Sequence, residues 1–85
     1  MKTIEYTLRD ELGLHARPAG QLVQIISKFE STVEIKTTER TENAKGIIGV
    51  MTLGLKQGQN MIMTFDGPDE DIAAAAAFKF LSETL

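Results

Sequence analysis

The 85-residue chain contains no cysteine, a single histidine and only two prolines. Without cysteine it can form neither a disulfide framework nor a thiolate metal site, so its stability must come from packing and backbone hydrogen bonds. A single histidine cannot supply the usual three ligands of a catalytic metal unless carboxylates do most of the work. We therefore expect no metal and no cofactor.

Membrane and export signals are also missing from the sequence. No apolar run approaches the length needed to cross a bilayer, and the N-terminal residues lack the apolar core of a signal peptide. The net charge is −3 and the nine basic residues are scattered, whereas nucleic-acid-binding domains usually carry a basic stripe. We expect a cytoplasmic chain without direct membrane insertion and without nucleic acid as a partner.

The composition is that of an ordinary globular protein. Hydrophobic residues make up 42% and charged residues 25%, and 85 residues are enough for one modest core but not for two. The sequence therefore predicts a single domain over residues 1–85.

Alternating apolar residues predict strands, and apolar residues three or four apart predict helices. The expected elements are a strand over 3–8, a helix over 16–28, strands over 32–37 and 40–43, a two-turn helix within 46–55, a strand over 61–65, and a helix beginning at 68–69. This order is typical of a split βαβ arrangement. We predict an α+β fold, an open-faced βαββαβα sandwich whose four-stranded, mostly antiparallel sheet is covered on one face by three helices.

Helical spacing also predicts which side chains are buried. The apolar stripe of the first helix should hold Ala19, Leu22, Val23, Ile26, and Phe29 or Glu30. The last helix contains five consecutive alanines, which fit either face. Its expected buried stripe is Ala73, Ala77, Phe80 or Leu81, and Thr84.

The only histidine directly precedes the first helix. The usual residue at such a position is Ser, Thr, Asp or Asn, whose side chain bonds the free N–H groups of the first turn. His15 is a poor substitute, so we expect the N–H groups of Ala16, Arg17 and Ala19 to remain free. Free N–H groups at the positive end of a helix bind anions, and the guanidinium of Arg17 suits phosphate oxygens.

The residues around this histidine fit a phosphoryl acceptor. Gly13 permits a positive φ and keeps bulk away from the imidazole, which should be exposed, and Pro18 stiffens the first turn. A neutral imidazole is a competent nucleophile near pH 7, and a group on its Nδ1 would sit over the helix N-terminus.

The residue pattern by itself leaves an ordinary surface histidine equally open. A hydrolase is not expected, because the chain has no phosphate-binding loop ending in Lys-Ser/Thr, no Ser-His-Asp set and no carboxylate cluster for Mg²⁺.

The stretch LGLHARPAG, residues 12–20, resembles the active-site motif of the HPr family, the histidine-containing phosphocarriers of the bacterial sugar phosphotransferase system. The similarity continues through AKGIIGVMTLGLKQGQNM, residues 44–61, and DGPDED, residues 66–71, and covers essentially the whole chain. The Leu-His-Ala-Arg-Pro run at 14–18 is far more specific than a histidine and an arginine two places apart. The resemblance implies a covalent phosphoryl carrier rather than an enzyme.

In such carriers the histidine accepts a phosphoryl group on Nδ1 from enzyme I, itself phosphorylated from phosphoenolpyruvate, and passes it to the IIA domains of sugar permeases. The resemblance assigns that role to His15. It assigns assistance at the phosphate to Arg17, phosphate binding to the amides of Ala16 and Arg17, and support of the helix start to Gly13 and Pro18. We expect a monomer.

The 46–55 stretch holds more apolar residues than one face of a two-turn helix can bury. Val50 and Leu53 are expected to complete the core. The resemblance assigns Ile47, Ile48 and Met51 to an exposed patch that meets both partner types, and an apolar centre with an adaptable methionine suits a transient interface. The polar rim expected around it consists of Gly20, Gln21, Gln24, Lys45, Thr52 and Gly54.

Two positions depart from the family pattern. Many HPr proteins carry a serine at position 46 that a metabolite-responsive kinase phosphorylates, whereas this chain has Gly46 and so lacks the regulatory serine. Gln24 stands where lysine is common, which weakens electrostatic steering toward an acidic partner.

Three functions are weighed on this basis. The first is phosphoryl transfer in sugar uptake, and the second is a regulatory binding module that reports phosphorylation state to a non-transport partner. The presence of His15 favours transfer over pure binding. The third, an interaction domain that is never phosphorylated, is disfavoured by the match at residues 14–18.

Overall fold

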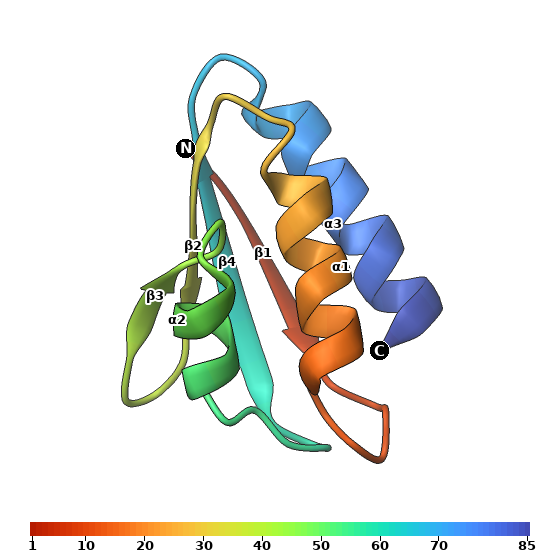
Figure 1. Ribbon diagram of the computed structural model, residues 1–85. Coiled ribbons are helices and arrows are strands. Elements are labelled where there is room, and N and C mark those ends of the chain that lie inside the picture. Colours follow the sequence, from red (N-terminus) through yellow and green to blue (C-terminus); the bar gives the residue numbers. More distant parts are fainter.

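The structure, a computed structural model, describes the whole chain, residues 1–85, and contains the seven expected elements in the expected order (Figure 1). They are β1 (Lys2–Thr7), α1 (Ala16–Ile26), β2 (Thr32–Lys36), β3 (Thr41–Asn43), α2 (Ile47–Thr52), β4 (Asn60–Asp66) and α3 (Glu70–Thr84).

The four strands form one sheet in the order β1-β4-β2-β3, and every neighbouring pair is antiparallel. β4 lies inside the sheet, because it pairs with β1 on one side and with β2 on the other. Met63 of β4, for example, lies between Ile4 of β1 and Ile35 of β2. The predicted antiparallel sheet is confirmed.

Alternation along the strands gives the sheet one buried and one exposed face. In β4, Met61, Met63 and Phe65 are buried, while Ile62 between them points to the other face and is half-exposed. Figure 1 shows α1 and α3 side by side across the buried face, with α2 next to α1 near β3. The open-faced sandwich is confirmed. No helix has both the length and the apolar character that crossing a bilayer requires.

The buried side of α3 differs in part from the prediction. The buried residues are Ala73, Ala74, Ala77 and Leu81. Thr84 is exposed, so its place in the predicted stripe was wrong, and Leu85 is buried at the end of the helix instead. Residues 77, 81 and 85 are four apart and share one face, and burying leucine gains more free energy than burying threonine.

The first helix ends earlier than predicted. α1 stops at Ile26 rather than Lys28, because the N–H groups of Lys28 and Phe29 donate to carbonyls only three residues back, at 3.3 and 3.1 Å. This is the tight geometry that often closes a helix.

The loop after α1 is held to the start of α3 by Asp69. Its carboxylate accepts the Glu30 N–H at 2.8 Å, the Ser31 N–H at 3.0 Å and the Ser31 hydroxyl, and caps no N–H of its own helix. Helix α3 therefore begins at Glu70, one residue after Asp69, and carries acidic residues in its first turn as expected.

Candidate phosphoryl-acceptor site

The site is built around the first turn of α1. His15 is the N-cap residue, with extended backbone (φ −88°, ψ −179°), and no side chain caps the helix. The N–H groups of Ala16 and Arg17 have no hydrogen-bond partner within the chain. The Ala19 N–H is not free, because it donates to the His15 carbonyl at 3.0 Å, so its predicted availability was wrong. Pro18 has no N–H, which leaves two amides at the positive helix end for an anion.

The imidazole lies at the surface beside a carboxylate. The His15 side chain is 36% exposed, so the predicted exposure is confirmed only in part. Its Nε2 lies 4.0 Å from Oδ1 of Asp10, whose side chain is 31% exposed. The ring is therefore reachable from solvent and has a negative charge facing one of its two nitrogens.

Gly13 connects this loop to the segment after α2. Its φ is +66°, as the sequence predicted, and a Cβ added there would lie 2.3 Å from the Leu55 carbonyl oxygen. The Leu14 N–H donates to the same oxygen at 3.0 Å. Only glycine lets the two backbones approach this closely, and the approach fixes where His15 stands.

The guanidinium of Arg17 is available for a ligand. Arg17 is exposed, and none of the four ion pairs of the chain includes it. At this helix start, two unpaired amides and the Arg17 guanidinium can bind a phosphoryl group, and the imidazole can form a bond to it.

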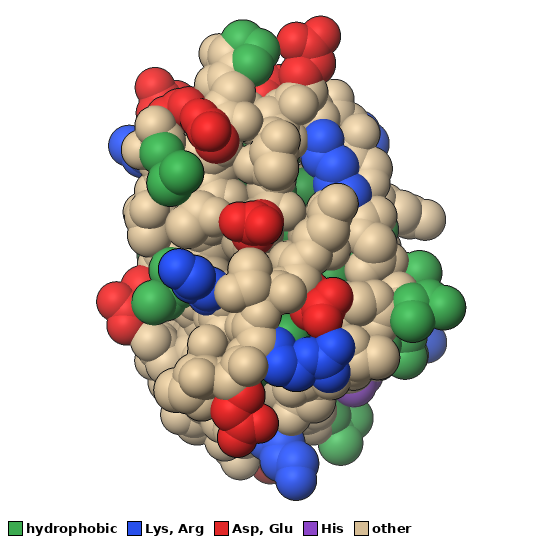
Figure 2. All heavy atoms as spheres, turned by 90° about the vertical axis from the view of Figure 1, so that its left-hand side faces the viewer, with side chains coloured by type: hydrophobic (Ala, Val, Ile, Leu, Met, Phe, Trp, Pro, Cys, Tyr) green, Lys and Arg blue, Asp and Glu red, His purple; other side chains and the backbone are tan.

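An apolar surface lies on α2. Val50 is buried and Leu53 half-buried, as predicted, while Ile47, Ile48 and Met51 are 38%, 76% and 46% exposed. Figure 2 shows the one histidine (purple) at the edge of this side of the molecule, with hydrophobic side chains (green) on either side of it. Ile47, Ile48 and Met51 therefore form an exposed apolar surface on α2.

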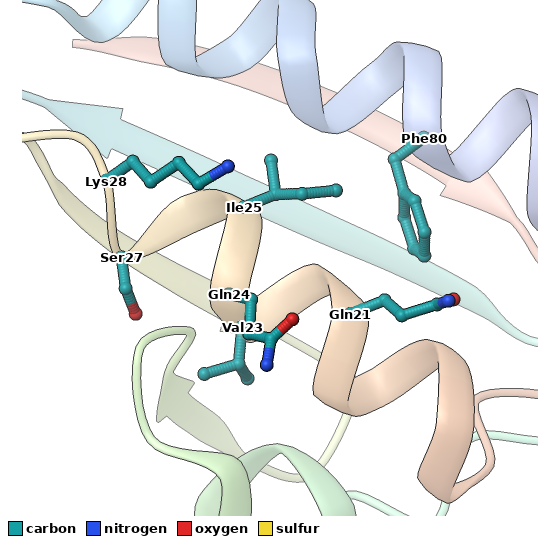
Figure 3. A pocket seen from close by; sticks show the side chains of 7 residues that line it. All are labelled: Gln21, Val23, Gln24, Ile25, Ser27, Lys28 and Phe80. Carbon is teal, nitrogen blue, oxygen red and sulfur yellow. The ribbon is translucent and has the colours of Figure 1, made fainter.

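None of the predicted rim residues is buried: Gln21, Gln24, Thr52 and Gly54 are exposed, and Gly20 and Lys45 are half-buried. The ammonium of Lys45 is already engaged, since it donates to the Phe29 carbonyl at 2.7 Å. Gln21 and Gln24 line a shallow hollow of about 610 Å³ over α1, which Phe80 of α3 borders on its far side (Figure 3).

The comparison with known proteins settles the family. A family model described as the PTS HPr component phosphorylation site matches residues 2–83. This chain belongs to the HPr family. It is 47% identical over 83 residues to the phosphocarrier protein HPr of Lysinibacillus sphaericus, covering 98% of this chain and 94% of the relative. The family supports a phosphocarrier role in the phosphotransferase system.

Solved structures in the HPr family share the fold. The histidine-containing phosphocarrier protein of Mycoplasma matches with a TM-score of 0.95 at 35% identity, covering 98% of this chain and 94% of that one. The catabolite-repression protein Crh of Bacillus subtilis, solved as a swapped dimer, matches with a TM-score of 0.77 at 30% identity, covering 100% and 98%.

Position 46 can be compared with the HPr pattern directly. Gly46 is the N-cap of α2, and no side chain caps this helix. A Cβ added there would meet only the Asn43 carbonyl oxygen, at an ordinary contact distance of 3.7 Å. The fold therefore has room for a serine, and its absence is a property of the sequence alone.

Asp10 was not among the residues predicted from the sequence. It lies five residues before His15 in a loop without periodicity, so no spacing rule connects the two. Their proximity depends on the path of the loop between β1 and α1.

Proposed function

We propose that this HPr-family chain accepts a phosphoryl group from phosphorylated enzyme I on Nδ1 of His15 and passes it to IIA domains of sugar permeases in the cytoplasm. The observation that carries the proposal is the uncapped start of α1, where His15 stands next to the unpaired amides of Ala16 and Arg17. An anion attached to the ring would meet N–H donors and the positive end of the helix dipole.

The small number of phosphate ligands suits a carrier. Two amides and the Arg17 guanidinium stabilise the phosphorylated state moderately, whereas a deeply bound phosphoryl group would raise the barrier to onward transfer. The covalent intermediate passes on the group it receives, so the chain acts as a carrier and not as an enzyme with its own turnover.

The docking surface is the α2 patch of Ile47, Ile48 and Met51, with the rim described above. Its apolar centre is exposed, and flexible methionine contacts allow one surface to fit two different partner types.

The chain works as a monomer in this proposal, although Crh is solved as a swapped dimer. Light scattering during gel filtration tests this, and a mass of two chains at micromolar concentration contradicts it.

The test of transfer is phosphorylation with enzyme I, Mg²⁺ and labelled phosphoenolpyruvate. Wild type should gain one acid-labile phosphate, and His15→Ala should gain none. The chain has no other histidine, so no second phosphohistidine can obscure the result. Absence of label on folded wild type would refute the carrier proposal. Label that persists in His15→Ala would show that another residue is phosphorylated.

The regulatory binding module is the second candidate, favoured by the 30% identity to Crh over the whole chain. The two functions differ at the second transfer. A carrier loses its label to a IIA domain, whereas a module that only reports phosphorylation state keeps the label and binds a partner instead.

A further inference from the structure

The loop before α1 is fixed around Asp10. The Asp10 N–H donates to the Leu85 carbonyl at 3.0 Å, and the Asp10 carbonyl accepts the Gly13 N–H at 2.9 Å. The neighbouring Arg9 strengthens the attachment, since its guanidinium donates to the Ser82 carbonyl at 3.0 Å. Both the backbone N–H and the backbone carbonyl of Asp10 are therefore hydrogen-bonded.

The side chain of Asp10 is oriented as well. Its Oδ1 accepts the Leu12 N–H at 2.8 Å, a local turn that fixes the carboxylate. The same oxygen lies 4.0 Å from Nε2 of His15. One fixed negative charge thus faces one particular ring nitrogen.

We propose that Asp10 is a positioning residue that holds the proton of neutral His15 on Nε2 and leaves the lone pair of Nδ1 free for the phosphoryl group. An anion near one ring nitrogen favours the proton on that nitrogen, and this choice decides which nitrogen is the nucleophile. The inference rests on the proposed function for its consequence, but the tautomer itself is a property of the unphosphorylated chain.

The assignment removes any need for proton transfer. The Nδ1 lone pair forms the new bond to phosphorus, the bond between phosphorus and the donor atom of enzyme I breaks, and the electron pair of that bond stays with the donor atom. Nε2 keeps its proton throughout, and the positive charge of the phosphorylated ring lies beside the Asp10 carboxylate. In onward transfer the P–Nδ1 bond breaks, its electron pair returns to Nδ1, and the same neutral tautomer is restored.

The test compares Asp10→Asn with Glu11→Gln. The asparagine carbonyl can still accept the Leu12 N–H, so the loop keeps its turn while the charge is lost. Glu11→Gln removes a charge from the next, exposed position, which has no ion pair, and serves as the matched control. Amide spectra of both variants establish that the fold is intact.

The first readout is the pair of ¹⁵N ring shifts of His15 in alkaline buffer, without any phosphoryl donor. Wild type and Glu11→Gln should show Nε2 protonated and Nδ1 unprotonated, and Asp10→Asn should show a mixture of tautomers. Ring shifts in Asp10→Asn identical to wild type overturn the inference.

The second readout is the initial rate of phosphorylation by enzyme I. We expect Asp10→Asn to slow this rate about fivefold, which is the factor that corresponds to the attraction between two unit charges 4.0 Å apart in a dielectric near that of water. Glu11→Gln should slow the rate less than about twofold. Equal rates in the two variants also overturn the inference. If folded wild type is never labelled, the proposed function fails, and the ring shifts still decide the role of Asp10.

Discussion

The close approach at Gly13 predicts a large and specific cost for a single methyl group. In Gly13→Ala the new Cβ would lie 2.3 Å from the Leu55 carbonyl oxygen and 2.7 Å from Lys56 Cα, both backbone atoms. Ordinary contacts between such atoms are about 3.5–4.0 Å, so one of the two backbone segments must move. The residue must also adopt a φ of +66°, which L-residues with a side chain disfavour.

The two effects can be separated by a control. Gly58 has a φ of +85°, but nothing lies within 4 Å of its added Cβ. Gly58→Ala should therefore cost only the conformational part, about 1–2 kcal/mol. Gly13→Ala should add about 1–3 kcal/mol for the forced shift, by analogy with overpacking of a well-packed interior. For a domain of this size the difference corresponds to roughly 5–20 °C in Tm.

Urea unfolding of both variants, followed by circular dichroism, measures the difference. Because Gly13 also sets the position of the His15 loop, Gly13→Ala should accept phosphate from enzyme I more slowly than Gly58→Ala under conditions where both are folded. Equal free energies of unfolding for the two variants would refute the reasoning, since they would mean that the backbones can separate without cost.

Three further predictions follow from other parts of the structure. Hydrogen bonds from the Ser31 hydroxyl, and then from backbone N–H groups, lower the pKa of Asp69 below its ordinary value of 3.8. The stability linked to this carboxylate is therefore present above that value and is lost as pH falls through the folded-state pKa. Asp69→Asn should flatten the fall in the free energy of unfolding below pH 3.8, and an unchanged acid profile contradicts this. Ile48→Gln on the α2 patch should raise KM for transfer from enzyme I about five- to tenfold without changing stability. Ile72→Gln replaces an apolar residue of α3 with similar exposure, 65% against 76% for Ile48, and should leave KM unchanged. Equal KM values for the two variants would show that the patch takes no part in docking. Incubation with an HPr kinase and ATP should add no phosphate to the wild-type chain, as measured by intact mass. The variant Gly46→Ser, which the fold can accommodate, serves as the positive control. A phosphate on wild type would show that another residue is phosphorylated in place of the missing serine.

Local sequence patterns were enough for most of the architecture. The period of two in the strands and of three to four in α1 follows from backbone geometry, so each element could be found without its neighbours. The uncapped helix start could also be predicted, because it depends only on which residue precedes Ala16 and on Pro18. Counting apolar side chains against one short helical face predicted that some residues of α2 stay exposed, and the resemblance to the HPr family indicated which ones.

The remaining features depend on contacts between residues far apart in the chain. The alanines of α3 carry no preference for either face, so packing against the sheet and the burial of Leu85 decided its orientation. The distance between Asp10 and His15, and the half-burial of the imidazole, depend on the loop being tied to the Leu85 and Leu55 carbonyls. The sequence by itself determined that a histidine would stand at an open helix end. Only the tertiary structure decided which charge faces that histidine, because hydrogen bonds from distant segments set the path of the loop.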